Sequence, residues 1–388
     1  MVRASPGGRV SVAVFSGEPS GDINAADLVE EMRRLRPAAE FWGVGGSALR
    51  RAGVRIEFDS TEWGAMGVWE ALKLAPRLHG YFQRCRERLT MRQPPLVVLV
   101  DFGAFNSRVA RVARALGSRV FWYFPPRSWS RSPHAAGDLA ELTDGVATPF
   151  PWSEAILRAA GVNARWVGHP LVERARAEWG KERFCREVGL DPGRPIVLFL
   201  PASRRAELRY IWPAMAAAAA EIERRVPTAQ PVVGLAPALS ARAQELAARH
   251  PTVRLTDRIY DALHACDAVV TKSGTVTLEA ICFLKPMVVL YRGSWLAELE
   301  YHLWHRKRIR FIAMPNIIAD AAICPELIQH QATPAAIAEP VCAWLTDPAA
   351  SQPIREALAQ VKAALGPPGA TRRAAEFAWS VLESTGRS

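Results

Sequence analysis

Two short glycine- and serine-rich turns, one in each half of the chain, carry residue types that could bind a phosphate. The first, SGEPSGD at residues 16–22, directly follows the apolar run 10–15. The second, SGTVTLE at residues 273–279, directly follows the apolar run 268–270. Where a buried strand passes into a helix, free backbone N–H groups and the positive end of the helix dipole can hold an anion. The matched pair indicates two doubly wound α/β domains that face each other across a cleft, as in enzymes that handle nucleotide-activated sugars.

Acidic residues in the first turn and after a later apolar run are the candidates for acid–base chemistry. Glu18 lies inside the turn, and Asp101 directly follows the apolar run 96–100. Polar groups at the carboxyl end of a buried strand point into the ligand crevice of an open α/β sheet, so both are catalytic candidates. Asp22 and Asn106 are candidates for substrate binding. For these two residues, capping of the following helix is the alternative interpretation.

An arginine after a strand-like run in the second half could bind a diphosphate. Arg204 ends the segment LPASR at residues 200–204, and a guanidinium can bind phosphate oxygens with two parallel hydrogen bonds. A surface ion pair with Glu207 is the alternative interpretation. The sequence has no DxD motif, so we expect neither a metal ion bridging the diphosphate nor a cofactor. Arg204 and a helix dipole would then balance the charge of a leaving nucleotide.

The second turn supplies the remaining candidates for nucleotide binding. The backbone N–H groups of Ser273, Gly274 and Thr275 could donate to the phosphates. Glu279, one turn into the following helix, could accept hydrogen bonds from both ribose hydroxyls. Asn316, in the segment MPNI, would complete the site. Together with Arg204, these residues predict a nucleotide-binding site in the C-terminal half.

Both halves of the chain alternate apolar strand-like runs with amphipathic helical runs. Strands that are apolar throughout and separated by helices are typical of a parallel sheet covered on both faces. The strand-like runs are 10–15, 41–44, 96–100, 120–124, 145–147, 196–200, 232–235, 253–255, 268–270 and 287–290. We therefore predict two Rossmann-like domains, at residues 1–170 and 171–368. Residues 369–388 predict a last helix that packs back on the N-terminal domain or on a partner subunit.

The charge and hydropathy of the chain restrict its partners. The formal net charge is +11 at pH 7, mostly from arginines spread along the whole chain. No basic block interleaved with aromatic residues occurs, so we expect no nucleic-acid partner. A surface that docks on anionic lipid and a compositional bias of the source genome would both explain the charge. No apolar run is long enough to span a bilayer, and no small-residue cleavage site follows the apolar start, which predicts a cytoplasmic protein.

The segment WGAMGVWEAL at residues 63–72 is crowded with large apolar side chains, and Lys73, Arg77 and Arg84 follow it. Large apolar groups next to cations suit a surface that dips into a membrane or binds acyl chains. Met66 and Trp69 are therefore candidates for substrate binding. A helix packed in the core is the alternative interpretation.

The cysteines indicate neither a disulfide framework nor a metal site. They show no CxxC spacing, and several lie in apolar helical contexts, where a free cysteine behaves as a small hydrophobe. The six are Cys85, Cys185, Cys266, Cys282, Cys324 and Cys342.

The motifs together resemble the lipid-A-disaccharide synthase family, inverting glycosyltransferases with the GT-B fold. The likeness runs along nearly the whole chain, and the order and spacing of its segments carry it. The segments are SGEPSGD (16–22), GVGG (43–46), MGVWEAL (66–72), FN (105–106), VGHP (167–170), LPASR (200–204), SGTVTLEA (273–280), PNII (315–318), PELIQ (325–329) and GATRRAA (369–375). The resemblance implies transfer of the glucosamine unit of UDP-2,3-diacylglucosamine to 2,3-diacylglucosamine 1-phosphate. The products would be lipid A disaccharide 1-phosphate and UDP, formed without a metal ion.

The resemblance also implies where the substrates bind. UDP would contact Arg204, the turn 273–275, Glu279 and Asn316 in the domain 171–368. Glu18 and Asp22 would act on the acceptor side, in the domain 1–170. The family works at the cytoplasmic face of the inner membrane of Gram-negative-type bacteria, which implies a peripheral membrane protein. It further implies a homodimer with exchanged C-terminal segments, which would give the last helix its purpose.

The chain departs from the family pattern mainly on the acceptor side. Where the family reads Asp-Ala-Pro-Asp-Phe-Asn, this chain reads DFGAFN at residues 101–106, so the second aspartate, a candidate base, is Ala104. Loss of a general base typically costs ~10²–10⁴-fold in rate. The family's Ser-Val-Trp-Ala-Trp segment is altered to PRSWSR at residues 126–131, and LPGSR has become LPASR.

These departures leave three hypotheses. The first is a lipid-A-disaccharide synthase in which Asp101 or Glu18 serves as base. The second is a related UDP-sugar glycosyltransferase with a different acceptor, motivated by the changes at residues 102–104 and 126–131. The third is a catalytically weakened or non-catalytic paralogue that binds a sugar nucleotide or a lipid. A UDP-sugar 2-epimerase shares the fold, but the turn 273–275 combined with the apolar segment 63–72 fits it less well.

Overall fold

The structure is a computed structural model that describes residues 10–17, 19–60, 68–202, 205–235, 253–293 and 310–384. Of residues 68–76 and 205–207, it describes the backbone but not the side chains. The chain forms two compact units. Unit 1 comprises Met1–Pro170 and Leu365–Ser388, and unit 2 comprises Leu171–Ala364.

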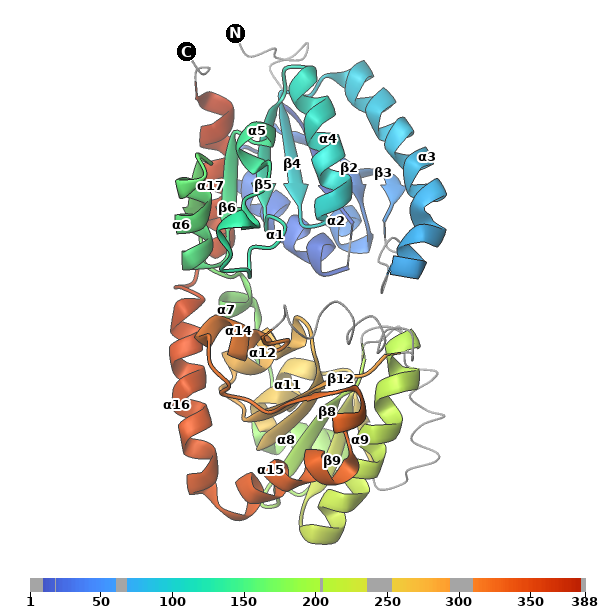
Figure 1. The fold of residues 1–388 in the computed structure, drawn as a ribbon, viewed down its shortest axis with the longest axis vertical. Helices are drawn as coiled ribbons and strands as arrows, with labels where there is room; N and C mark the ends of the chain where they lie inside the picture. The colour runs from blue at the N-terminus through green and yellow to red at the C-terminus, as the bar shows by residue number, and fades with distance from the viewer. Residues whose placement is uncertain are drawn as a thin grey trace. The chain divides into compact units, whose positions relative to one another are not determined.

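Unit 1 is built on a seven-stranded parallel sheet with the strand order β3-β2-β1-β4-β5-β6-β7 (Figure 1). The strands are β1 (Ser11–Ser16), β2 (Glu40–Gly45), β3 (Arg55–Asp59), β4 (Leu96–Val100), β5 (Arg119–Tyr123), β6 (Gly145–Thr148) and β7 (Ala164–Trp166). The sequence pattern did not indicate β3 and β7, because these edge strands are partly exposed and lack a continuous apolar run. The strand order reverses between β1 and β4. A ligand crevice opens at such a reversal, at the carboxyl ends of the strands.

Helices cover both faces of this sheet. Side chains alternate between the two faces along each strand, so each strand contributes to two separate cores. On one face Val12 and Val14 share a core with α1 (Pro19–Leu35), α2 (Ser47–Arg51) and α17 (Ala370–Glu383). On the other face Ala13 and Phe15 pack with residues of α3 (Val68–Arg92), α4 (Gly103–Ala115), α5 (Leu139–Leu142) and α6 (Pro151–Ala159). The two cores fix the sheet between them, so the ends of β1 and β4 are held in place.

The last helix of the chain, α17, packs on unit 1. It contacts α1, β5 and β6 and is drawn in red beside this sheet in Figure 1. The indole Nε1 of Trp379 donates to the carbonyl oxygen of Met32 at 3.1 Å. The guanidinium of Arg36 lies 4.5 Å from the centre of the Trp379 ring and forms an ion pair with Glu383. Segments from both ends of the sequence thus complete one unit.

Unit 2 is built on a six-stranded parallel sheet with the order β10-β9-β8-β11-β12-β13, which reverses between β8 and β11. Helices α9 and α15 share a large core with this sheet. The strands are β8 (Ile196–Leu200), β9 (Gln230–Gly234), β10 (Arg254–Thr256), β11 (Ala268–Lys272), β12 (Met287–Tyr291) and β13 (Glu326–Ile328). The helices are α7 (Leu171–Arg174), α8 (Lys181–Val188), α9 (Arg205–Arg225), α11 (Ile259–Ala265), α12 (Val276–Cys282), α14 (Met314–Ala319), α15 (Pro334–Thr346) and α16 (Pro348–Ala364).

The two doubly wound parallel sheets confirm the predicted fold class. All six cysteines are buried free thiols, and burial raises the pKa of the Cys85 thiol to about 12. Within the described ranges, no helix has both the length and the apolarity needed to cross a bilayer.

Candidate active site

The turn after β1 and the turn after β4 are in contact in unit 1. Gly17 lies so close to the ring of Phe102 that an added β-carbon would fall 2.2, 2.3 and 2.6 Å from three ring atoms. An added β-carbon on Gly21 would lie 3.1 Å from Oγ of Ser16 and 3.3 Å from Cβ of Asp101. The two glycines therefore allow the first turn to pack directly against Asp101 and Phe102, at the point where the strand order reverses.

Asp101 is held in a strained conformation. Its φ angle is 54° and that of Phe102 is 48°, so two consecutive non-glycine residues are left-handed. Each such residue costs about 1–3 kcal/mol and persists only where neighbouring structure enforces it. The Asp101 carboxylate accepts from the Phe102 N–H at 3.1 Å. Nδ2 of Asn106 donates to the carbonyl oxygens of Asp101 at 2.8 Å and Val100 at 3.3 Å.

The sequence pattern suggested Asn106 as a cap at the start of the helix that follows it. In the structure, Asn106 lies inside α4. The helix begins at Gly103, and the Asn106 side chain donates to preceding carbonyls, so it is not the N-cap. The residue is 1% exposed. Among the described residues, its Oδ1 has no hydrogen-bond partner, and neither has the buried Oγ of Ser16.

Asp22 has a local structural role. It was considered as a cap of the helix that follows the first turn, but that helix, α1, begins at Pro19, so Asp22 lies within it. Its buried carboxylate accepts from the N–H groups of Gly46 at 2.6 Å, Ala48 at 2.8 Å and Leu49 at 3.4 Å. Asp22 therefore holds the start of α2 and ties the GVGG segment to α1.

The segment 126–131, which departs from the family pattern, lies beside the same turn. An added β-carbon on Gly103 would lie 2.7 Å from Cβ of Pro126. Arg127 is left-handed with a φ angle of 61°. The guanidinium of Arg131 lies 4.2 Å from the centre of the Trp152 ring. The changed residues are thus next to the start of α4, where Ala104 replaces the family's aspartate.

In unit 2, the second turn connects β11 to α12. The Ser273 N–H donates to the carbonyl oxygen of Leu290 at 2.8 Å, and Oγ donates to that of Ile312 at 2.7 Å. Gly274 has a φ angle of 141°, and an added β-carbon there would lie 3.8 Å from Nζ of Lys272. An ammonium group therefore stands next to the turn that we expect to bind phosphates.

Glu279 lies on α12 next to Tyr260 of α11. The Tyr260 hydroxyl donates to Oε1 of Glu279 at 3.4 Å. Burial raises the pKa of Glu279 because it penalises the carboxylate, and the charge of Arg174 partly offsets this effect. Burial, and then the charge of Glu279, raise the pKa of Tyr260 to about 12. Glu279 is thus a half-buried acid whose charge depends on its neighbours.

Asn316 is completely buried and its amide is fully used. Nδ2 donates to the carbonyl oxygen of Cys324 at 2.9 Å and to Glu326 at 2.8 Å, and Oδ1 accepts from the N–H groups of Ile323 and Cys324. Glu326 also accepts from the N–H groups just before α14. The pair Asn316–Glu326 therefore fixes the loop between α14 and β13. The expected contact between Asn316 and UDP stays a prediction.

The structure brings part of the predicted set together. In unit 1, the turn after β1 packs against Asp101, and Asn106 donates to the carbonyl oxygen of Asp101. The carboxylate of Asp22 instead accepts hydrogen bonds from the start of α2. In unit 2, Ser273 contacts the segment before α14, the helix that carries Asn316. The predictions for Glu18, Met66 and Arg204 concern residues outside the described ranges, and Trp69 lies on α3 without a described side chain.

Sequence reasoning missed Phe102, Lys272, Tyr260 and Glu326. Only Lys272 carried a local signal, as the last residue of a strand directly before the serine–glycine turn. The other three act through contacts between segments that are separate in the sequence or, for Phe102, through a backbone conformation that its residue type disfavours.

Solved structures that align with nearly the whole chain include a glycosyltransferase and several UDP-GlcNAc 2-epimerases. The glycosyltransferase of kitacinnamycin matches with a TM-score of 0.65 at 14% identity, covering 96% of this chain and 99% of that one. The UDP-GlcNAc 2-epimerase from Neisseria meningitidis bound to UDP-GlcNAc matches with a TM-score of 0.64 at 13% identity, covering 96% and 100%. At such identities the likeness defines the fold alone: a GT-B-like fold shared by glycosyltransferases and UDP-GlcNAc 2-epimerases.

The sequence relatives decide between these activities. The family model for lipid-A-disaccharide synthetase matches residues 12–374. The lipid-A-disaccharide synthase of Geobacter sulfurreducens is 37% identical over 380 residues, covering 97% of each chain, and that of Nitrosococcus oceani is 34% identical over 381 residues, covering 96% of each. The chain belongs to the lipid-A-disaccharide synthase family. It is a glycosyltransferase of lipid A biosynthesis, as the first hypothesis predicted.

Proposed function

We propose that Asp101 is the general base for transfer of 2,3-diacylglucosamine from UDP to 2,3-diacylglucosamine 1-phosphate. An acceptor hydroxyl attacks the anomeric carbon of the donor, and the bond from that carbon to the UDP oxygen breaks. The hydroxyl proton passes to the Asp101 carboxylate, and UDP leaves with the bonding electrons. One observation supports this most strongly: Asp101 follows β4 at the reversal of strand order, packed against the glycine turn of β1.

Asp101 compensates for the aspartate that is absent at position 104. Ala104 is exposed in the first turn of α4, three residues from Asp101. The strained backbone at Asp101 and the support from Asn106 are typical of a preorganised catalytic group. Glu18 is the second candidate, because it belongs to the turn that packs on Asp101.

On the donor side, Arg204 and the N–H groups of Gly274 and Thr275 bind the diphosphate of UDP. Ser273 holds the turn in place, because its N–H and Oγ donate to the carbonyl oxygens of Leu290 and Ile312. Lys272 adds a positive charge beside this turn, which stabilises the leaving UDP. Glu279 accepts hydrogen bonds from the ribose hydroxyls, and Asn316 contributes by fixing the loop next to the turn.

On the acceptor side, Asp22 and Asn106 hold the ends of the strands in place through the contacts described above, and Asn106 supports the backbone at Asp101. Met66 and Trp69 contact the acyl chains. Because both substrates carry acyl chains, the enzyme works as a peripheral protein at the cytoplasmic face of the inner membrane. The net charge of +11 supports attachment to anionic lipid.

Two copies form a dimer by exchanging the segment from Leu365 onward. In one chain this segment leaves α16 through Gly366 and Gly369, both left-handed, and then packs on unit 1. The same contacts would form with the unit 1 of a partner. Light scattering on the purified protein tests this, and a monomer at all concentrations would rule it out.

The test of the base is the Asp101→Asn variant. Disaccharide formation is measured by mass spectrometry with both substrates in detergent and without added metal. We expect kcat to fall by ~10²–10⁴-fold, with the affinity for UDP unchanged. Asp59→Asn, a change of an exposed carboxylate at the end of β3, is the matched control and should keep full activity. Turnover by Asp101→Asn at the normal rate would disprove the assignment, and Glu18→Gln would then be examined.

A further inference from the structure

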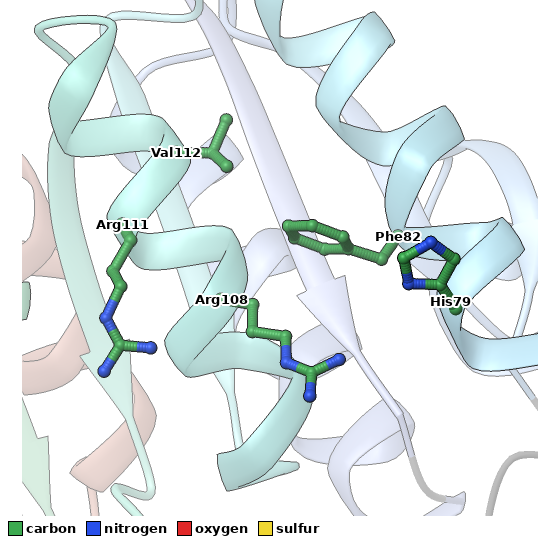
Figure 2. A pocket seen from close by; sticks show the side chains of 5 residues that line it. All are labelled: His79, Phe82, Arg108, Arg111 and Val112. Atoms are coloured by element: carbon green, nitrogen blue, oxygen red, sulfur yellow. The ribbon is translucent and has the colours of Figure 1, made fainter. Parts of the chain in front are cut away.

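A groove lies between α3 and α4 on unit 1, apart from the residues proposed above to bind substrate. Its volume is about 440 Å³, within the roughly 300–1,000 Å³ of pockets that hold small molecules. His79 and Phe82 of α3 and Arg108, Arg111 and Val112 of α4 line it. Figure 2 shows Phe82 extending from α3 toward α4, with Arg108 and Arg111 projecting from α4.

The groove has an apolar lining and a basic rim. Phe82 and Val112 are half-buried, and His79, Arg108 and Arg111 are exposed. Arg111 forms an ion pair with Asp138, whereas Arg108 has no ion pair within the described ranges. An apolar lining next to exposed cations is complementary to an acyl chain whose head group is anionic.

A row of aromatic rings connects the groove to the candidate base. The rings of Phe82 and Phe105 are 6.2 Å apart, and those of Phe105 and Phe102 are 5.6 Å apart. Phe102 follows Asp101 and covers Gly17. Since α4 begins at Gly103 and rises 1.5 Å per residue, the groove residues of α4 lie about 8–14 Å along the helix from its start. Phe105 is 6% exposed, so this row runs through the core, with the half-buried Phe102 and Phe82 at its two ends.

We infer that the α3–α4 groove binds an acyl chain of the phosphorylated glucosamine acceptor. The inference rests on the proposed function, because a base that takes the acceptor's proton places the acceptor, and not the donor, next to Phe102. The acyl chain passes over Phe102 and Phe82, whose rings both lie next to the buried Phe105, into the groove. Arg108 attracts the acceptor through its negative charge.

The first test fills the groove and measures binding without turnover. In Val112→Trp, the indole occupies the space next to Phe82. Ala115→Trp, an exposed change one turn further along α4, is the matched control. Equilibrium binding of 2,3-diacylglucosamine 1-phosphate is measured without donor, for a series of acyl lengths below the concentration at which the lipid aggregates.

The wild type should bind about fourfold more tightly for each methylene buried in the groove. Val112→Trp should flatten this dependence on chain length and weaken binding of the longest acceptor at least tenfold. Ala115→Trp should behave as the wild type. An unchanged affinity and chain-length dependence in Val112→Trp would overturn the inference.

A second variant removes the charge without changing the apolar lining. Arg108→Glu should weaken binding of the phosphorylated acceptor and leave binding of the dephosphorylated compound nearly unchanged. Because Arg108 is exposed, this variant keeps its fold, which unfolding by urea verifies. An equal loss for both compounds would contradict the role given to the charge.

Two further measurements separate the alternatives. Sedimentation with phosphatidylglycerol vesicles should give equal binding for the wild type and Val112→Trp. A loss of vesicle binding with unchanged acceptor binding would assign the groove to bilayer lipid and overturn the inference. Asp101→Asn should keep the chain-length dependence while turnover is lost, so a failure of the proposed base and a failure of the groove give different results.

Discussion

Asn106 should control catalysis through the position of Asp101. In Asn106→Leu the side chain keeps a similar size but loses Nδ2, which donates at 2.8 Å to Asp101, at 3.3 Å to Val100 and, more weakly, at 3.5 Å to Phe15. The two shorter hydrogen bonds contribute about 1 kcal/mol each, and three carbonyl groups are left with fewer donors. We therefore expect the free energy of unfolding to fall by about 2–3 kcal/mol, measured by urea denaturation.

The free energy lost with these hydrogen bonds is comparable with the energy of the strained backbone that they help to hold. A left-handed non-glycine residue costs about 1–3 kcal/mol, so without Asn106 the backbone at Asp101 and Phe102 relaxes. A displacement of the carboxylate by about 1 Å would lower kcat by about 10²-fold. The KM for the UDP donor should stay unchanged, because the predicted UDP contacts lie in unit 2. Asn163→Leu, which removes a bond to the carbonyl oxygen of Asp144 on an exposed surface, is the matched control and should keep the wild-type kcat.

A double-mutant comparison distinguishes this mechanism from general destabilisation. If Asn106 acts by positioning Asp101, then Asp101→Asn combined with Asn106→Leu should be no slower than Asp101→Asn alone. Disaccharide formation is measured at a temperature where all variants are folded. Multiplicative losses in the double variant, or a normal kcat in Asn106→Leu, would refute the reasoning.

Three other substitutions test the geometry. In Glu279→Gln, UDP affinity should fall while the variant becomes more stable than the wild type as the pH rises above about 4. The reason is that the raised pKa of Glu279 stabilises the wild type at low pH, and this contribution is lost as the pH rises through the folded-state pKa. Calorimetric titration measures the affinity for UDP, and urea unfolding at several pH values measures the stability. Equal stability of the variant and the wild type at all pH values would contradict the role given to the pKa. Asp22→Ala should lower the free energy of unfolding by about 1–3 kcal/mol through the lost cap of α2, and a urea midpoint equal to that of the wild type would count against the cap. Gly17→Ala should lower kcat at least tenfold, because the new methyl group must displace Phe102, and retained activity would show that the two turns need not touch.

The local sequence pattern predicted the elements that are apolar throughout. The run 10–15 became β1 (Ser11–Ser16), and the run 96–100 became β4 (Leu96–Val100). Such strands are recognisable because both faces of a doubly wound sheet are buried. Edge strands such as β3 and β13 were missed, since partial exposure removes the continuous apolar run that marks a buried strand.

Helix starts were predicted less well than strands. The sequence pattern offered Asp22 and Asn106 as possible caps of the helices that follow them, but α1 begins at Pro19 and α4 begins at Gly103, so both residues lie inside these helices. Turn residues such as Gly and Ser carry no apolar periodicity, so helical first turns built from them look like loops. As a result, the interpretation of Asp22 as a cap of α1 was wrong, although its carboxylate does cap a helix, α2.

The sequence by itself determined the fold class, the family and the residue types available for catalysis. These follow from the order of the apolar runs and from motifs that are continuous along the chain. Only the tertiary structure decided which polar groups act together. Nδ2 of Asn106 reaches backbone groups of β4 and of Asp101, and Asp22 reaches the start of α2, because parallel strands and their crossovers bring distant turns to one edge of a sheet. The α3–α4 groove has the same origin: its lining comes from two helices that the sequence separates and that the sheet holds side by side.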